Sequence, residues 1–139
     1  MTLTEALAAL HRAGKIASPW LPGMHGFDTR GVGFRVLLMH HSGGAIVMTD
    51  GMITQTLPVS AEFMGMAIHD LQDRATIGCL LALAREVWGD PGLHACPHSS
   101  GTVWWVYTGQ GHGPIAQGPT EAEALAACII AAAEALEAP

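Results

Sequence analysis

Formal charge is the first thing that this sequence lacks. Only 13% of its 139 residues are Asp, Glu, Lys or Arg, against roughly a quarter in ordinary globular proteins. Six of the charged residues are basic and twelve are acidic, so the formal net charge is −6. The basic residues are scattered along the chain. They therefore predict no basic stripe of the kind that binds duplex nucleic acid or an anionic membrane surface.

The sequence also lacks a membrane-spanning segment. The apolar run at residues 77–84 is too short to cross a bilayer, and the N-terminus does not have the pattern of a secretory signal peptide. Three cysteines (Cys79, Cys96 and Cys128) are an odd count and too few for a disulfide framework. We therefore expect a cytoplasmic protein with reduced thiols and no membrane association.

Apolar residues, by contrast, are abundant and make up 50% of the chain. So few charges cannot cover the surface of a lone subunit well. The composition favours either an oligomer that hides an apolar face or a monomer with an exposed binding patch. We predict a homo-oligomer.

Hydrophobic periodicity and turn residues predict one α+β domain over residues 1–139. The connections are hairpins, so we expect an antiparallel sheet, made of a three-stranded meander and a hairpin, with helices packed on it. Residues 1–60 form the first helix and the meander, residues 73–137 form a helix–hairpin–helix half, and residues 58–72 are left unassigned. The order is α-βββ-α-ββ-α, with helices at 3–12, 74–88 and 121–137 and strands at 32–41, 45–49, 52–57, 102–108 and 114–117.

Three short signals set the boundaries of these elements. Thr2 and Glu5 form a predicted capping box, as do Thr120 and Glu123, and Asp73 is the predicted N-cap of the middle helix. The turns Ser42–Gly44 and Asp50-Gly51 are typical of hairpins. Both faces of the strand at 32–41 are largely apolar, which predicts that it is covered on both sides or lies at an interface.

Candidate binding residues lie on two predicted strands. Trp104 and Trp105 are adjacent and point to opposite faces, so one ring belongs to the core and the other is available to a helix, a partner subunit or a ligand. Tyr107 extends this aromatic strand. His40 at the end of an earlier strand is a candidate pocket residue, and Arg35 is a candidate cation for an anionic ligand held between subunits.

The segment His94-Ala95-Cys96-Pro97-His98 holds three potential zinc ligands in a predicted loop. His94, Cys96 and His98 would need a fourth ligand, for which His112 and Asp90 are candidates. Zinc with an open coordination position would activate water for hydrolysis, although no partner carboxylate is evident from the sequence. The alternative is a solvated loop with no metal.

The second half of the chain, residues 73–137, resembles the ABA-sandwich domain of small bacteriophage and prophage proteins. The resemblance lies in the amphipathic helix at 75–83, the aromatic strand at 104–107 and the Gly-led cap and Ala/Leu helix at 118–125. It implies a fold and a phage origin, and it brings no catalytic residues. The Gly-x-Thr-x-x-Glu-Ala-Leu segment is also similar to antitoxins of the HicB type.

These observations favour a non-enzymatic phage or prophage accessory protein that acts by binding in the host-cell cytoplasm. Its partner is expected to be a host protein, as for an anti-defence inhibitor, or a small nucleotide that it sequesters. The alternatives are a zinc-dependent hydrolase that uses His94, Cys96 and His98, and a HicB-like antitoxin module.

Overall fold

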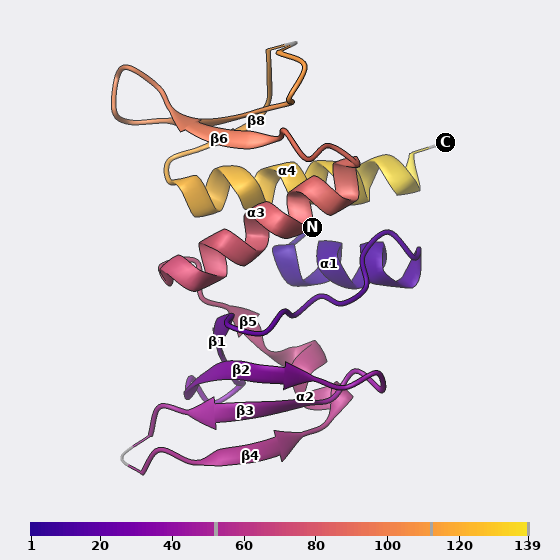
Figure 1. Ribbon diagram of the computed structural model, residues 1–139, viewed down its shortest axis with the longest axis vertical. Coiled ribbons are helices and arrows are strands. Elements are labelled where there is room, and N and C mark those ends of the chain that lie inside the picture. The colour runs from indigo at the N-terminus through magenta and orange to yellow at the C-terminus, as the bar shows by residue number, and fades with distance from the viewer. Residues whose placement is uncertain (52, 112, 139) are drawn as a thin grey trace. The chain divides into compact units, whose positions relative to one another are not determined.

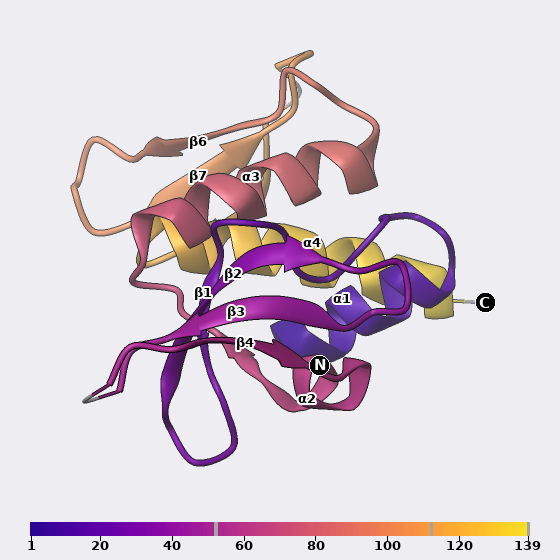
Figure 2. The same cartoon turned by 60° about the horizontal axis from the view of Figure 1, so that its bottom comes forward.

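A computed structural model of the chain describes residues 1–51, 53–111 and 113–138 (Figures 1 and 2). Over these residues the protein is α+β with antiparallel sheets and packed helices, as the sequence predicted. It has four helices, a five-stranded sheet and a three-stranded sheet. None of the described helices is both long enough and apolar enough to cross a membrane. The chain divides into two compact units, which we call the terminal unit (residues 1–17 and 80–139) and the middle unit (residues 18–79).

The terminal unit brings together both ends of the sequence. Its sheet has the order β6-β7-β8, and α4 packs on all three strands while α1 packs on α4. In Figure 1 the helices of this unit lie on one side of the sheet. The elements are α1 (Leu3–Arg12), the latter part of α3 (Arg74–Trp88), β6 (His94–Pro97), β7 (Trp104–Tyr107), β8 (Pro114–Gly118) and α4 (Glu121–Glu137).

The predicted helix starts are confirmed. Thr2 and Glu5 form the complete capping box of α1. Thr120 Oγ1 accepts the Glu123 backbone N–H at 3.2 Å and donates to the Glu123 carboxylate at 3.0 Å. Asp73 Oδ2 accepts a backbone N–H from the first turn of α3 at 3.0 Å. These local bonds satisfy helix N–H groups that have no partner within the helix, which is why short sequence signals locate them.

One prediction about the terminal unit was wrong. The segment from His94 to Pro97 is an edge strand rather than a loop, because it pairs with β7 through Ala95 opposite Val106. The strand is only four residues long and ends in a proline, so its sequence carries little strand signal.

The middle unit is built on a sheet of order β4-β3-β2-β1-β5. The predicted hairpin between β2 and β3 is confirmed, with Gly43 at a positive φ of 90°. The predicted third strand at 52–57 is displaced toward the C-terminus, and its first residue, Met52, lies outside the described residues. The elements are β1 (His25–Phe27), β2 (Gly33–Met39), β3 (Ala45–Thr49), β4 (Thr56–Val59), α2 (Ala61–Met66), β5 (Ile68–His69) and the first part of α3.

Strand β2 sends different side chains to its two faces. Phe34 and Val36 are buried at 1% exposure each, and Arg35 between them projects from the opposite face. The pairing with β3 shifts register between Val36 and Leu38, so the alternation breaks there. Leu37 and Leu38 are 43% and 52% exposed. The second half of the strand is therefore not covered on both sides within the described chain, and the alternative of an interface stays a prediction.

Candidate functional site

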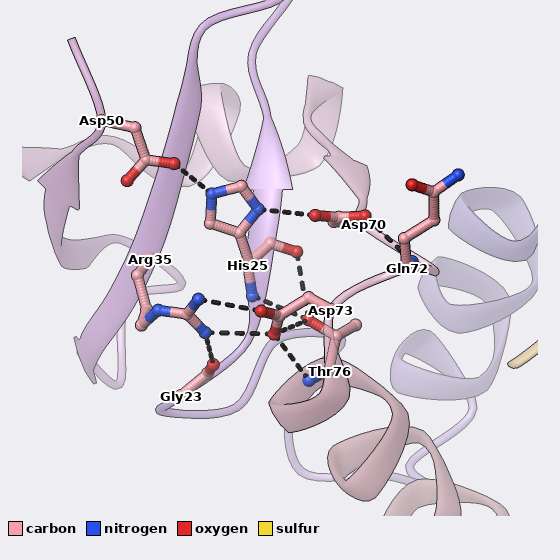
Figure 3. Close-up of polar contacts among 8 residues, drawn as sticks. All are labelled: Gly23, His25, Arg35, Asp50, Asp70, Gln72, Asp73 and Thr76. Carbon is pink, nitrogen blue, oxygen red and sulfur yellow. Dashed lines mark hydrogen bonds and ion pairs between the residues drawn. The ribbon is translucent and has the colours of Figure 1, made fainter.

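A network of charged side chains lies in the middle unit around His25 (Figure 3). His25 on β1 is the cross-strand partner of Arg35 on β2, so both side chains project from the same face of the sheet. Helix α3 begins at this face. Its Thr76 Oγ1 accepts the His25 backbone N–H at 2.8 Å, which ties the helix start to the edge of β1.

Both ring nitrogens of His25 contact carboxylates. Nδ1 lies 2.9 Å from Asp70 Oδ2, and Nε2 contacts Asp50 Oδ2. The His25 side chain is 11% exposed, that of Asp70 is 18% exposed and that of Asp50 is 49% exposed. The His25 ring therefore lies between two carboxylates, one mostly buried and one half-exposed.

Arg35 completes the network. Its guanidinium donates to Asp73 at 3.0 Å and 2.9 Å and to the backbone oxygen of Gly23 at 2.7 Å. The hydrogen bonds from Arg35 hold the pKa of Asp73 well below its usual range, and the same pair raises the pKa of Arg35. The cationic side chain is therefore already neutralised within the unit.

Gly33 makes room for the contact between His25 and Asp50. A Cβ at this position would lie 2.5 Å from Asp50 Oδ2 and 3.0 Å from His25 Nε2. Any other residue here would push the carboxylate away from the imidazole. The glycine at the start of β2 is thus part of the site.

The sequence analysis found only one member of this network as a candidate binding residue. Arg35 was predicted to bind a ligand, and it is engaged by Asp73. His25 and Asp70 were not singled out, and Asp50 was interpreted as a turn residue. They come from three separate segments with no spacing pattern, so a single sequence offers no signal for them. His40 is exposed next to the turn at 42–44, and its side chain makes no hydrogen bond or ion pair among the described residues.

The terminal unit carries a second candidate site, on the face of the three-stranded sheet opposite α4. Val106 is fully buried, so Trp105 and Tyr107 on either side of it point the other way. Cross-strand pairing places Cys96 beside Trp105 and His94 beside Tyr107. We call His94, Cys96, His98, Trp105 and Tyr107 the aromatic face. By alternation Trp104 shares the side of Val106, and both tryptophans are half-buried.

The rings of the aromatic face form a continuous row. Ring centroids are 4.6 Å apart for His98 and Trp105, 6.0 Å for Trp105 and Tyr107, and 5.7 Å for Tyr107 and His94. The chain from residue 91 to residue 120 contains no Asp, Glu, Lys or Arg. This face is therefore aromatic and free of formal charge apart from any proton on its histidines.

Trp105 also holds an unpaired donor. Its Nε1 is buried and has no hydrogen-bond partner among the described residues. Burying such a group costs about 1–3 kcal/mol. The indole is therefore not placed to maximise the stability of the unit, which is common for residues that serve a function.

The predicted zinc ligands do not form a metal centre in the part of the chain that the structure describes. Within that part, no three His, Cys, Asp or Glu side chains are placed to hold a metal ion. His94 Nδ1 lies 3.0 Å from the Gly92 backbone oxygen, and His98 Nδ1 lies 3.0 Å from Ser100 Oγ. His112, the suggested fourth ligand, lies outside the described residues.

Comparison with known proteins finds no similarity that bears on function: no family model, no curated protein and no solved structure matches the chain.

Proposed function

We propose that this protein acts by binding another protein through its aromatic face. The observation that carries the proposal is the continuous row of rings on the sheet face opposite α4, in a segment without formal charge. The centres of protein interfaces are enriched in Trp and Tyr and depleted of charged residues. Trp105 lies in the middle of the row, where the residues that contribute most to binding are usually found.

The same composition argues against a nucleotide ligand at this face. Phosphate groups are recognised by Arg, Lys or helix N-termini, and the segment 91–120 has no Arg or Lys. In the middle unit, Arg35 is already paired with Asp73. Of the two partner classes that the sequence suggested, a host protein is therefore the better supported.

The proposed setting is that of a phage or prophage accessory protein, with inhibition of a host defence protein as the expected outcome. This part of the proposal is supported only by the resemblance of residues 73–137 to the phage ABA-sandwich domain. The proposal of binding through the aromatic face does not depend on this resemblance.

The first test compares three proteins in a lysate of the bacterial host. They are the wild type, Trp105→Ala on the aromatic face, and Leu136→Ala as a matched control, because Leu136 is an apolar residue of the same unit that is 43% exposed. We expect one protein to be retained by the wild type and the control and lost with Trp105→Ala. That protein is then purified, and Trp105→Ala should weaken its affinity by roughly 30-fold, the effect of a residue worth about 2 kcal/mol. Equal binding of the purified protein by all three would overturn the proposal.

The second test asks whether the partner is another copy of this chain. Composition predicts self-association, and light scattering of the purified wild type over a concentration series measures it. A dimer that Trp105→Ala converts to a monomer would assign the aromatic face to self-association and contradict a different protein partner. An oligomer that Trp105→Ala leaves intact would place the subunit contact elsewhere and keep the proposal.

A further inference from the structure

We propose that the aromatic face binds a proline-rich segment of its partner, held in the polyproline II conformation. This inference rests on the proposed function, because it names the kind of segment that the same face takes. It depends on the protected edges of the three-stranded sheet, on the absence of formal charge, on the spacing of the rings and on the uncharged hydrogen-bond donors beside them.

The edges of the three-stranded sheet are poorly suited to pairing with a strand from a partner. The His98 N–H donates to the Val103 backbone oxygen at 2.8 Å, and the backbone groups of an antiparallel strand alternate between its two sides. The outward positions of β6 are therefore Ala95 and Pro97, and proline has no N–H to donate. At the other edge, the pairing of β8 with β7 shifts register, and such a bulge disrupts an edge ladder. We therefore expect a partner segment to be held by side chains of the sheet face.

Charge narrows the choice of segment further. A phosphorylated or acidic segment is recognised by a cluster of arginines, and residues 91–120 include no Arg or Lys. A basic segment is best held by carboxylates, and the same residues include no Asp or Glu. Proline is uncharged, and proline-rich segments bind surfaces that are lined by aromatic rings. The neutral aromatic face therefore matches a neutral, proline-rich ligand.

The spacing of the rings suits an extended segment. A polyproline II helix rises about 3.1 Å per residue and has three residues per turn, so one turn covers about 9 Å. Ring centroids are 6.0 Å apart for Trp105 and Tyr107 and 5.7 Å apart for Tyr107 and His94. Each turn of a segment that lies along the row therefore passes more than one ring, which gives every turn an aromatic contact.

Uncharged donors lie beside the row of rings. The carbonyl oxygens of a polyproline II helix have no partner within the helix, so they accept hydrogen bonds from a binding surface. Gln117 on β8 is the cross-strand partner of Trp105, which places its exposed side chain on the aromatic face. Among the described residues, neither the Gln117 amide nor the Tyr107 hydroxyl makes a hydrogen bond. Trp105 Nε1 is buried, so Trp105 contributes ring surface rather than its N–H.

Titration of the full-length protein with a decaproline peptide, followed by NMR spectroscopy, tests the inference. The peptide is capped at both ends, so it is uncharged, and it adopts the polyproline II conformation. A capped Gly-Ser peptide of the same length is the control, because it is equally neutral but flexible. We expect saturable shift changes at the backbone amides of β6 and β7 with decaproline and none with the control peptide.

Three variants locate the binding surface. Trp105→Ala should weaken decaproline binding by roughly 30-fold, the usual effect of a central interface residue. Gln117→Ala should weaken it by about fivefold, the effect of one neutral hydrogen bond. Because Gln117 is exposed, this variant tests the surface even if Trp105→Ala does not fold. Leu136→Ala, at an exposed position of α4, should bind as the wild type does.

Failure of this inference is distinguishable from failure of the proposed function. The inference is refuted if decaproline does not bind, if the two peptides bind equally, or if Gln117→Ala and a folded Trp105→Ala bind decaproline as the wild type does. Competition with the lysate partner separates the two proposals. A partner that depends on Trp105 and is displaced by decaproline supports both. A partner that depends on Trp105 but is not displaced overturns the proline-rich segment and keeps binding through the aromatic face.

Discussion

At the scale of single residues, burial has a strong effect on His69. Its Nε2 donates to the Pro19 backbone oxygen at 2.9 Å, and its ring stacks on Trp20 with centroids 3.7 Å apart. Nδ1 is buried and has no partner among the described residues. Burial lowers the pKa of His69 to about 4, because the charged ring would lose its hydration.

This low pKa makes the fold sensitive to acid. The ordinary pKa of a histidine is about 6.5, so between about pH 6.5 and 4 the unfolded chain binds a proton at His69 that the folded chain does not. The contribution of His69 to stability is therefore complete above about pH 6.5 and is lost as the pH falls toward 4. We predict that this residue alone costs about 2 kcal/mol of unfolding free energy between pH 7 and 4.5.

Urea denaturation of the wild type and His69→Gln at the two pH values measures the effect. The glutamine keeps a donor for the Pro19 oxygen and does not titrate, so the variant should lose about 2 kcal/mol less than the wild type on acidification. His40→Gln, at an exposed position, should show the wild-type pH dependence. Equal acid sensitivity of the wild type and His69→Gln would contradict the assignment.

At the scale of elements, the joint between β8 and α4 depends on Gly118. A Cβ at this position would lie 2.6 Å from the Ala124 backbone nitrogen and 2.8 Å from the Glu123 carbonyl carbon. Those atoms belong to the first turn of α4 and cannot rotate aside as a side chain would. Gly118→Ala should therefore force β8 away from the helix and destabilise the protein by about 2 kcal/mol or more.

Thermal and urea unfolding of two glycine variants test this joint. Gly78→Ala is the control, because Gly78 lies within α3 and a Cβ there meets nothing within 4 Å. It should leave stability unchanged or raise it by about 0.5–1 kcal/mol, the usual gain of alanine over glycine inside a helix. Similar effects of the two substitutions would show that the close approach at Gly118 does not limit stability.

Elements with strong local signals were predictable from the sequence, and short ones were not. The capping residues Thr2, Asp73 and Thr120 located three helices because a cap is a local interaction. Strands β1, β5 and β6 have two to four residues, too few for an alternation pattern. These short strands form because neighbouring strands pair with them. That pairing depends on tertiary contacts, which the local sequence does not predict.

The same limit applies to the two candidate sites. The aromatic face was partly predictable, since Trp105 and Tyr107 are two residues apart on one strand and share a face by alternation alone. The network around His25 was not, because it joins residues 25, 50 and 70 across three segments. The pairing of β1 with β2 and β5, and of β2 with β3, brings them together.

At the scale of the whole molecule, the two ends of the chain belong to one compact unit. Residues 1–17 lie in the same unit as the C-terminal helix. Helix α1 packs on α4, and its Leu7 and Leu10 are 0% and 1% exposed. The sequence analysis grouped this helix with the β-meander of the middle unit. Its apolar stripe was visible in the sequence, but the surface that covers the stripe was not.

The packing of α1 on α4 predicts that the first helix stabilises the C-terminal helix. Leu7→Ala removes a fully buried side chain and should lower the free energy of unfolding by about 3 kcal/mol, measured by urea denaturation with circular dichroism. Amide protection should also fall along α4, although no residue of α4 is changed. Leu136→Ala, at an exposed position of α4, should cost less than about 0.5 kcal/mol. If Leu7→Ala is as mild as Leu136→Ala and α4 keeps its protection, then the N-terminal helix does not pack on the C-terminal one, and the terminal unit must be stabilised by its sheet and the remaining helices alone.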